Sequence, residues 1–308
     1  MSRRSSHGRL QQLARMVPAP VRSSIKEFGN RVQAIRARQR FDGARIATRT
    51  LDIRALDIRA LDILQRQYRV AHVNYEYAPD DRLARGRARC AALEAHTPRT
   101  RGTSLEIGSA DAMTSAELAR AGWKATGIDI DVSRTDARAG DAGVTVLEMD
   151  ATRLLFPDAS FDLAFSFNVF EHLPDPASTF AEIVRVLRPG GIAYISFTGL
   201  RWSPHGAHMY KVINVPYITV LFEEAEVLAY LREKGLPDRF PWVNEYSIER
   251  FRKVFRGHAS TLATLHYEET WNRWHSDLIA RYPGVFKARA PSFDSLLVDS
   301  VHARFKRI

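Results

Sequence analysis

The sequence lacks the residues and runs that several large classes of protein require. Cys90 is the only cysteine among 308 residues, which excludes a disulfide framework and a multi-cysteine zinc site. No stretch of 18 or more apolar residues occurs, which argues against a membrane-spanning helix. The first residues also lack the apolar core of a secretory signal. We therefore expect a protein of a reducing, cytoplasmic compartment.

The composition is that of a globular protein, but its charge is unevenly placed. The chain is 45% hydrophobic and 26% charged, with a formal net charge of +10. Residues 1–50 hold twelve Lys and Arg against two Asp and Glu, which accounts for the whole excess, while the 33 basic and 33 acidic residues that follow cancel. A basic arm on a neutral body predicts an anionic partner, such as lipid headgroups or nucleic acid. The alternative is a solvated leader.

The N-terminal part carries two helical patterns. Residues 21–41 place Ile25, Phe28, Val32 and Ile35 on one face and arginines on the other. Such a helix either lies on an anionic membrane surface, which would make residues 1–41 a peripheral membrane anchor, or packs on its own protein. The unit LDIRA then recurs in three copies over residues 51–63, where we expect a helix without chemistry of its own.

From residue 104 onward, short apolar strands alternate with helices. Strands are expected at residues 105–107, 124–130, 144–149, 161–167, 192–197, 262–267 and 296–303. A capping box at residues 114–117 and the pair Asp175-Pro176 predict helix starts. This pattern predicts an α/β fold with a doubly wound, mostly parallel, seven-stranded sheet, closed by an antiparallel pair. We divide the chain into an arm (1–50), a helical extension (51–99) and a main domain (100–308) with an insertion at 198–245.

The turn after the first of these strands lacks glycines that a nucleotide-binding turn usually carries. In LEIGSADAM, which starts at residue 105, Gly108 is present but Ala110 and Ala112 stand where further glycines are expected. A pyrophosphate needs bare backbone, and Asp111 would add a negative charge beside it. A phosphate-free cofactor such as S-adenosylmethionine fits better, because Asp111 can approach its ammonium group. Asp129, 21 residues after Gly108, has the spacing of a carboxylate that accepts hydrogen bonds from a ribose diol.

Four motifs together resemble a known family: LEIGSADA, ATGIDID, VLEMDATRLLFPDASFDLAFSFNVFEHL and VLRPGGIAYISF. In order and spacing, over about residues 100–200, they are similar to the class I S-adenosylmethionine-dependent methyltransferases. The most similar branch is the small-molecule one with Asn and Glu-His-Leu after the fourth strand. The resemblance implies a Rossmann-like fold and S-adenosylmethionine as cofactor.

The resemblance also implies a set of cofactor contacts at the ends of the strands. Glu106 would organise the turn, which Gly108 and Ser109 complete with their backbone. Asp129 would hold the ribose hydroxyls and Ile130 would flank the adenine. Further contacts are implied for Asp150 and Ala151, which would bind the adenine, and for Asn168 beside the methionine end.

The insertion at residues 198–245 is the expected cover of the methyl acceptor. A hydroxyl acceptor needs a base within hydrogen-bond reach, and the candidates are His208 first, then His205, then His172. No Asn/Asp-Pro-Pro motif follows the fourth strand, which argues against methylation of an adenine or glutamine amino group. His205 and His208 have a spacing compatible with a metal, but no third ligand stands out and no metal is expected.

The expected function is therefore O-methylation of a small molecule, a glycan or a lipid-linked sugar. Two alternatives stay open. The first is a catalytically silent protein of the same fold that binds a partner, which the altered turn would suit. The second is a nucleic-acid methyltransferase, which the basic arm would suit. The neutral body argues against nucleic acid as a partner, because the surface beside the active site should then be basic.

Overall fold

The computed structural model describes residues 19–45, 58–68, 78–97, 101–209 and 212–308. The chain divides into two compact units, each of which is described by itself. One comprises residues 1–55 and 272–293, and the other comprises residues 56–271 and 294–308. The sequence pattern had placed residues 272–293 in the main domain, whereas the structure groups them with the N-terminal residues.

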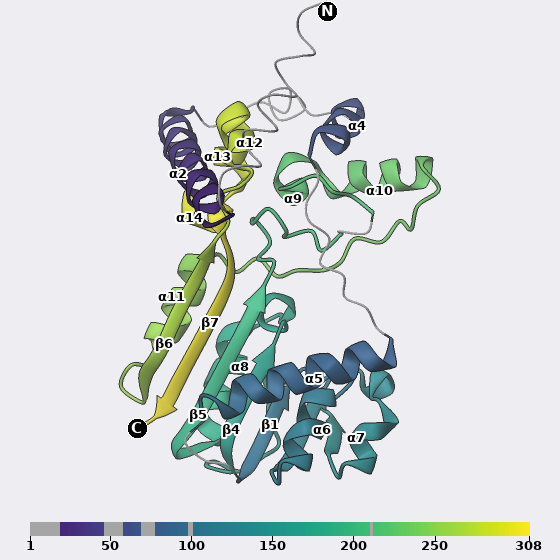
Figure 1. The fold of residues 1–308 in the computed structure, drawn as a ribbon, viewed down its shortest axis with the longest axis vertical. Helices are drawn as coiled ribbons and strands as arrows, with labels where there is room; N and C mark the ends of the chain where they lie inside the picture. Colours follow the sequence, from purple (N-terminus) through teal and green to yellow (C-terminus); the bar gives the residue numbers. More distant parts are fainter. Residues whose placement is uncertain (1–18, 46–57, 69–77, 98–100, 210–211) are drawn as a thin grey trace, which may run out of the picture. The chain divides into compact units, whose positions relative to one another are not determined.

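The larger unit is built on a seven-stranded sheet with the strand order β3-β2-β1-β4-β5-β7-β6 (Figure 1). Strands β1 to β5 pair in parallel, and β7 runs antiparallel to both β5 and β6. This confirms the predicted fold class. The strands are β1 (Thr103–Ile107), β2 (Lys124–Asp129), β3 (Thr145–Glu148), β4 (Phe161–Phe167), β5 (Leu187–Thr198), β6 (Leu262–Trp271) and β7 (Val298–Arg307).

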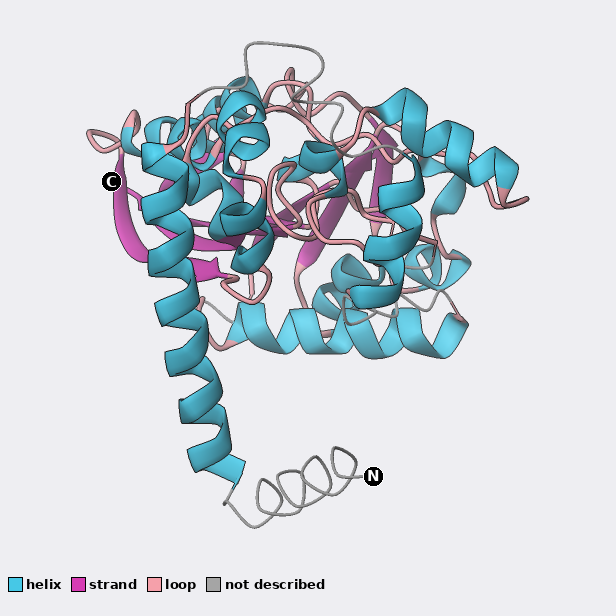
Figure 2. Ribbon diagram, turned by 90° about the horizontal axis from the view of Figure 1, so that it is seen from above, coloured by secondary structure: helices cyan, strands magenta, loops and turns pink. Residues whose placement is uncertain are grey.

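Helices cover both faces of this sheet (Figure 2). Leu163 and Phe165 of β4 pack beneath α5 (Pro79–Glu94) and α6 (Met113–Arg120). Ala164 points the other way, toward α8 (Pro176–Val186) and α11 (Ile248–Arg256), as the alternation of side chains along a strand requires. The short helices α7 (Ala137–Asp141), η1 (Val132–Arg134) and η2 (Phe170–His172) connect the strands.

The starts of two helices test the capping predictions. Asp175 caps α8 as expected, because its carboxylate accepts hydrogen bonds from the backbone N–H groups of Ala177 and Ser178. The predicted capping box at residues 114–117 is wrong, since α6 begins earlier, at Met113. The first N–H groups of α6 are bound instead by side chains from outside the helix, those of Asp111 and Glu106. Carboxylates at a helix N-terminus also complement its positive end.

The insertion after β5 packs against α4 (Ile58–Gln67), which begins within the LDIRA repeat and continues beyond it. The Gln65 amide donates to the carbonyl oxygen of Val212 at 3.1 Å and accepts from the Asn214 N–H at 2.9 Å. The insertion contains α9 (Ile218–Leu221) and α10 (Glu224–Glu233). Its Tyr217 is fully buried, whereas Trp242 is 58% exposed.

The smaller unit contains α2 (Ala19–Gly43), α12 (Ser276–Arg281) and α13 (Pro283–Arg289), and α14 (Phe293–Leu297) starts at its last residue. Helix α2 buries Ala34, Ala37 and Phe41, and the Phe41 ring lies 5.5 Å from that of Phe293. The expected packing face is therefore wrong, because Phe28 and Ile35 are 69% and 59% exposed. Among the described residues, no helix is long and apolar enough to cross a membrane.

Candidate active site

The parallel strands bring the predicted cofactor residues to one edge of the sheet. Gly108 follows β1, Asp129 ends β2 and Asn168 follows β4, and the carboxyl ends of parallel strands lie at the same edge. Gly108 and the loop after β4 are in close contact, since a Cβ on Gly108 would lie 2.4 Å from Cγ2 of Val169. Strands β1 and β4 are neighbours in the sheet, so the winding reverses between them as predicted.

The turn after β1 adopts the backbone that glycines would favour, although two of its residues are alanines. Gly108, Ala110 and Ala112 have φ angles of 68°, 47° and 55°. Residues with a Cβ occupy this left-handed region at a cost of about 1–2 kcal/mol each. The missing glycines therefore have not changed the shape of the turn. They have made it a strained one, which the surrounding contacts must hold in place.

Asp129 provides the main contact that holds this turn. One oxygen of its carboxylate accepts from the Ala110 N–H at 2.8 Å, and the other accepts from the Asp131 N–H at 3.1 Å. The exposed guanidinium of Arg134 lies 3.4 Å from the same second oxygen. Asp129 is 7% exposed. A carboxylate has about four lone-pair sites, so capacity for a ribose diol remains.

Glu106 supports the turn from below. Its Oε2 accepts from the Ser115 N–H at 3.1 Å and from the Ser115 hydroxyl at 2.7 Å, and the side chain is buried. Burial raises the pKa of Glu106 to about 7, while the bonds from Ser115 oppose that rise. Glu106 thus joins the end of β1 to the first turn of α6, and its implied place beside the cofactor stays a prediction.

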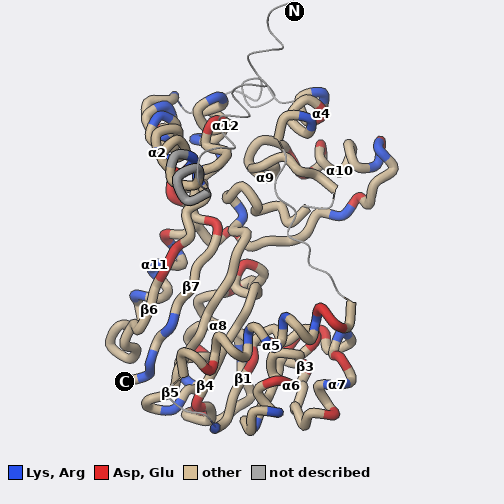
Figure 3. The backbone as a smooth tube through the Cα atoms, viewed as in Figure 1, with Lys and Arg blue, Asp and Glu red and all other residues tan. Residues whose placement is uncertain are grey.

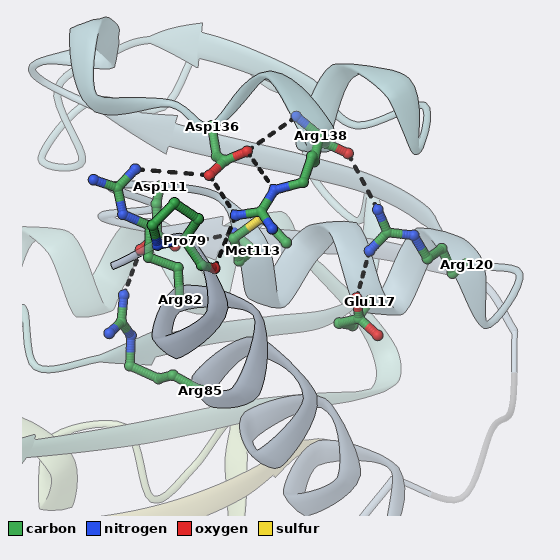
Figure 4. Close-up of polar contacts among 9 residues, drawn as sticks. All are labelled: Pro79, Arg82, Arg85, Asp111, Met113, Glu117, Arg120, Asp136 and Arg138. Atoms are coloured by element: carbon green, nitrogen blue, oxygen red, sulfur yellow. Dashed lines mark hydrogen bonds and ion pairs between the residues drawn. The ribbon is translucent and has the colours of Figure 1, made fainter. Parts of the chain in front are cut away.

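Asp111 points toward α5, as Figure 4 shows. Its Oδ2 is 2.5 Å from the guanidinium of Arg85, and its Oδ1 accepts from the Met113 N–H at 3.1 Å. Asp136, which caps α7, accepts from Arg138 at 2.7 Å and lies 3.7 Å from Arg82. The Arg85–Asp111 pair ties α5 to the turn, and the Arg82–Asp136 pair ties α5 to the start of α7. Asp111 therefore has a structural partner besides the predicted ammonium group.

The predicted adenine side presents exposed apolar surface. Ile130 is 77% exposed, and Leu155, in the loop after β3, is 76% exposed. Asp150 is exposed as well and accepts from both the N–H and the hydroxyl of Thr152 at 2.8 Å, while Ala151 is buried. The sequence analysis did not predict a role for Leu155. Its position in the segment DATRLLF, shortly after Asp150, was the only signal for one.

His205 is held by a carboxylate on β7. Its Nδ1 is 2.6 Å from Oδ2 of Asp299, whose other oxygen accepts from the Ser203 hydroxyl at 2.7 Å. Asp299 was also missed, because the sequence pattern marks β7 only as a closing strand. This arrangement, an imidazole oriented by a carboxylate, is one in which a general base is commonly held.

His208 and His172 lie together, with ring centroids 4.9 Å apart and nearly perpendicular. Nε2 of His208 bonds to the carbonyl oxygen of Gly199, and Nδ1 of His172 bonds to that of Trp242, both at 2.8 Å. Burial lowers the pKa of His208 to about 4 and also lowers the pKa of His172. His208, which the sequence analysis ranked first as the base, is thus a weak base in this position.

A buried carboxylate accompanies these two rings. Glu171, only 1% exposed, has no hydrogen-bond partner among the described residues for either carboxylate oxygen. Burial raises the pKa of Glu171 to about 8, with backbone N–H groups of Glu171 and Thr198 nearby partly opposing that rise. One ligand atom each from Glu171, His172 and His208 lie within 4.8 Å of one another. The structure therefore groups His208 with these residues, not with His205 as the sequence spacing suggested.

Comparison with known proteins finds similarity to methyltransferases over the central part of the chain. Residues 105–195 match the family described as "Methyltransferase domain". An uncharacterized methyltransferase of Mycobacterium sp. (strain JLS) is 38% identical over 107 residues, which are 34% of this chain and 42% of that protein. The chain thus spans less than half of that relative's length.

Two more distant similarities extend further along the chain. The ubiquinone biosynthesis O-methyltransferase of Paramagnetospirillum magneticum is 29% identical over 157 residues, covering 44% of this chain and 60% of that protein. A solved S-adenosylmethionine-dependent methyltransferase from Mesorhizobium loti aligns over 70% of this chain and 96% of its own, with 21% identity and a TM-score of 0.44.

The strained turn makes a prediction about stability. Ala110→Gly should raise the free energy of unfolding by about 0.5–1 kcal/mol, because glycine adopts the left-handed backbone without a Cβ clash. Ala112→Gly should gain less, since the Ala112 methyl group is fully buried beside Met113 and Ala125. Urea denaturation of each variant measures the effect.

Ala181→Gly, at an exposed position in the interior of α8, is the matched control. It should lower the free energy of unfolding by about 1 kcal/mol, because an interior helical glycine costs backbone entropy. A loss of similar size for Ala110→Gly would show that the turn does not have this conformation.

Proposed function

We propose that the chain is an active S-adenosylmethionine-dependent methyltransferase of class I, because residues 105–195 match the family described as a methyltransferase domain. In this proposal it transfers a methyl group from S-adenosylmethionine to a hydroxyl group of a small molecule, a glycan or a lipid-linked sugar. The observation that carries the proposal is the turn of Gly108, locked by a bond of 2.8 Å to the buried Asp129 at the tip of the neighbouring strand.

The residues at this edge of the sheet fit the cofactor. The Gly108 turn brings its backbone close, and Asp129 offers acceptor capacity for the ribose hydroxyls. The large exposed surfaces of Ile130 and Leu155 suit an adenine ring, because exposed apolar side chains beside a crevice often mark a ligand. No phosphate-binding backbone is needed, so the alanines of the turn are compatible with this cofactor.

His205 is the proposed general base. When bound, S-adenosylmethionine supplies an electrophilic methyl group on a sulfonium, so the protein has to position the acceptor and remove its proton. With Nδ1–H donated to Asp299, the lone pair of neutral His205 lies on Nε2. That nitrogen would accept the hydroxyl proton of the acceptor, which would leave the acceptor oxygen as the nucleophile for the methyl group that the bound cofactor supplies.

An oxygen acceptor is favoured over the alternatives. The relative from Paramagnetospirillum magneticum is a ubiquinone biosynthesis O-methyltransferase. The segment Asn168-Val169-Phe170-Glu171 also has no Pro-Pro pair after β4. Nucleic acid is disfavoured because the larger unit has 28 Lys and Arg against 31 Asp and Glu, a net charge of −3. A nucleic-acid surface beside the site would need positive charge.

The first test concerns the cofactor. Asp129→Ala should weaken the binding of S-adenosylhomocysteine about 10- to 100-fold, because a charged hydrogen bond to ligand contributes about 1.5–3 kcal/mol. Isothermal titration calorimetry gives the dissociation constants. Asp131→Asn, two residues further on and exposed, is the control and should bind as the wild type does. Equal affinities for Asp129→Ala and wild type would refute the proposed site.

The second test concerns the base. Methyl-labelled S-adenosylmethionine and an extract of the source cells should yield a labelled product, which then serves as the assay substrate. His205→Gln should lower kcat about 100-fold or more, and Asp299→Asn should lower it less, with S-adenosylhomocysteine affinity unchanged in both. Cofactor binding without any labelled product would favour the catalytically silent alternative. An unchanged kcat in His205→Gln would eliminate this base.

The smaller unit supports a second proposal, attachment to an anionic membrane surface. Residues 1–55 and 272–293 hold seventeen Lys and Arg against four Asp and Glu, a net charge of +13. Figure 3 shows basic residues along α2. The helical spacing places Phe28, Val32 and Ile35 opposite the packed residues Ala34 and Ala37. An outward apolar stripe between arginines is typical of helices that lie in a lipid interface.

Substitution of this stripe tests the membrane proposal. The double variant Phe28→Ser, Ile35→Ser should bind phosphatidylserine-rich vesicles at least about tenfold more weakly than wild type, because two buried apolar side chains are lost. Vesicle sedimentation measures the partition. Leu265→Ser, a 48% exposed position on β6, is the control and should bind as wild type. Equal sedimentation of all three proteins would exclude this surface.

A further inference from the structure

The cluster of Glu171, His172 and His208 has the composition of a metal site that the proposed reaction leaves unused. It contains two imidazoles and one carboxylate, with one ligand atom from each within 4.8 Å of the others. Glu171 and His172 lie in η2, directly after β4, and His208 belongs to the insertion after β5. Two neighbouring strand ends thus deliver the three groups to the edge of the sheet that carries the cofactor residues.

We propose that Glu171, His172 and His208 bind one divalent first-row transition-metal cation. Two nitrogen ligands and one carboxylate favour ions such as Zn²⁺, Co²⁺, Fe²⁺ or Mn²⁺ over Mg²⁺ or Ca²⁺, which take oxygen ligands. Metal–ligand distances of about 2.0–2.2 Å place donor atoms about 3–3.6 Å apart in a tetrahedral site. The three ligand atoms therefore need to close in by about 1 Å.

Both rings are held in the way that metal-binding histidines are. The second ring nitrogen of such a ligand almost always donates to a carbonyl or carboxylate, which fixes the tautomer. Here Nδ1 of His172 bonds to the Trp242 carbonyl and Nε2 of His208 bonds to the Gly199 carbonyl, both at 2.8 Å. With those nitrogens protonated, the lone pairs that bind a cation lie on Nε2 of His172 and Nδ1 of His208.

The backbone of His208 is strained. Its own φ angle is 52°, in the left-handed region, and its ring lies over Gly199, whose φ angle is 71°. A Cβ on Gly199 would lie 2.2 Å from Nε2 of His208, so only glycine admits the ring here. Strained backbone of this kind is concentrated at functional sites.

Glu171 supplies an independent observation that points to a ligand. Its side chain is 1% exposed, yet neither carboxylate oxygen makes a hydrogen bond of ordinary geometry with a described residue, although the backbone N–H groups of Glu171 and Thr198 lie near enough to lower its pKa. A carboxylate that served only to brace the loop would be expected to accept hydrogen bonds, because buried polar groups without partners are rare. A cation bound between Glu171 and the two imidazoles would satisfy it.

The cation also bears on the acceptor, and this step rests on the proposed function. Three protein ligands leave positions open on a metal that takes four to six, and two adjacent oxygens of one molecule can fill them. The geometry points to an acceptor with neighbouring oxygens, such as a vicinal diol, a catechol or a hydroxy acid. His205, which is not in the cluster, keeps its role as base.

Co²⁺ is the probe, because its visible spectrum reports binding and coordination number. Metal-free protein should bind one equivalent of Co²⁺, which Zn²⁺ displaces. Glu171→Gln and His208→Ala should each weaken Co²⁺ binding at least about tenfold. If His208→Ala fails to fold, His172→Gln replaces it as the second variant, because His172 is the most exposed of the three residues. His266→Ala on β6, where the imidazole lies 3.4 Å from Glu268, is the control and should bind as wild type.

The outcomes separate this inference from the proposed function. Wild-type binding no tighter than that of Glu171→Gln, or an equal loss in His266→Ala, overturns the cation site. Calorimetry with S-adenosylhomocysteine on the same samples reports the cofactor site. Cofactor binding without Co²⁺ binding would refute the cation site and leave the proposed function standing. Co²⁺ binding without cofactor binding would refute the proposed function and leave the cation site standing. Catechol should change the Co²⁺ spectrum while phenol should not, and an equal response to both overturns the two-oxygen acceptor.

Discussion

The hydrogen bond between the Ala110 N–H and the Asp129 carboxylate is the interaction on which the site depends. It joins the turn after β1 to the tip of β2 over 2.8 Å, where three residues of the turn have left-handed backbone. Two of these three carry a Cβ, so the local sequence does not favour the conformation. The neighbouring strand imposes it, and the turn keeps its shape only while the sheet keeps its register.

Much of the larger unit was predictable from the sequence because local and tertiary signals agree there. Apolar runs of strand length alternate with helices from residue 103 to residue 198, and parallel pairing then forces Gly108, Asp129 and Asn168 to one edge. The capping box failed for a related reason. Its residues have the right pattern, but Asp111 and Glu106 satisfy the first N–H groups of α6 from outside the helix.

The groups of the acceptor side were less predictable because they come from separate parts of the chain. Asp299 meets His205 across 94 residues, and Trp242 meets His172 across 70. No short motif contains either pair. Glu171 was visible in the Glu-His-Leu pattern, but only its burial without a partner distinguishes it from an ordinary surface glutamate. The ranking of the histidines changed for the same reason, since burial and carbonyl partners are properties of the folded chain.

The smaller unit has a consequence for the order in which the chain can fold. Helix α2 packs with α12 and α13, which follow it by more than 230 residues and lie between β6 and β7. At a synthesis rate of about 5–20 residues per second, a nascent α2 waits roughly 12–50 seconds for these partners to leave the ribosome. During that interval Phe41 is not covered by Phe293. Both the packing face and the exposed apolar stripe of this basic helix are then accessible to chaperones or to a lipid surface.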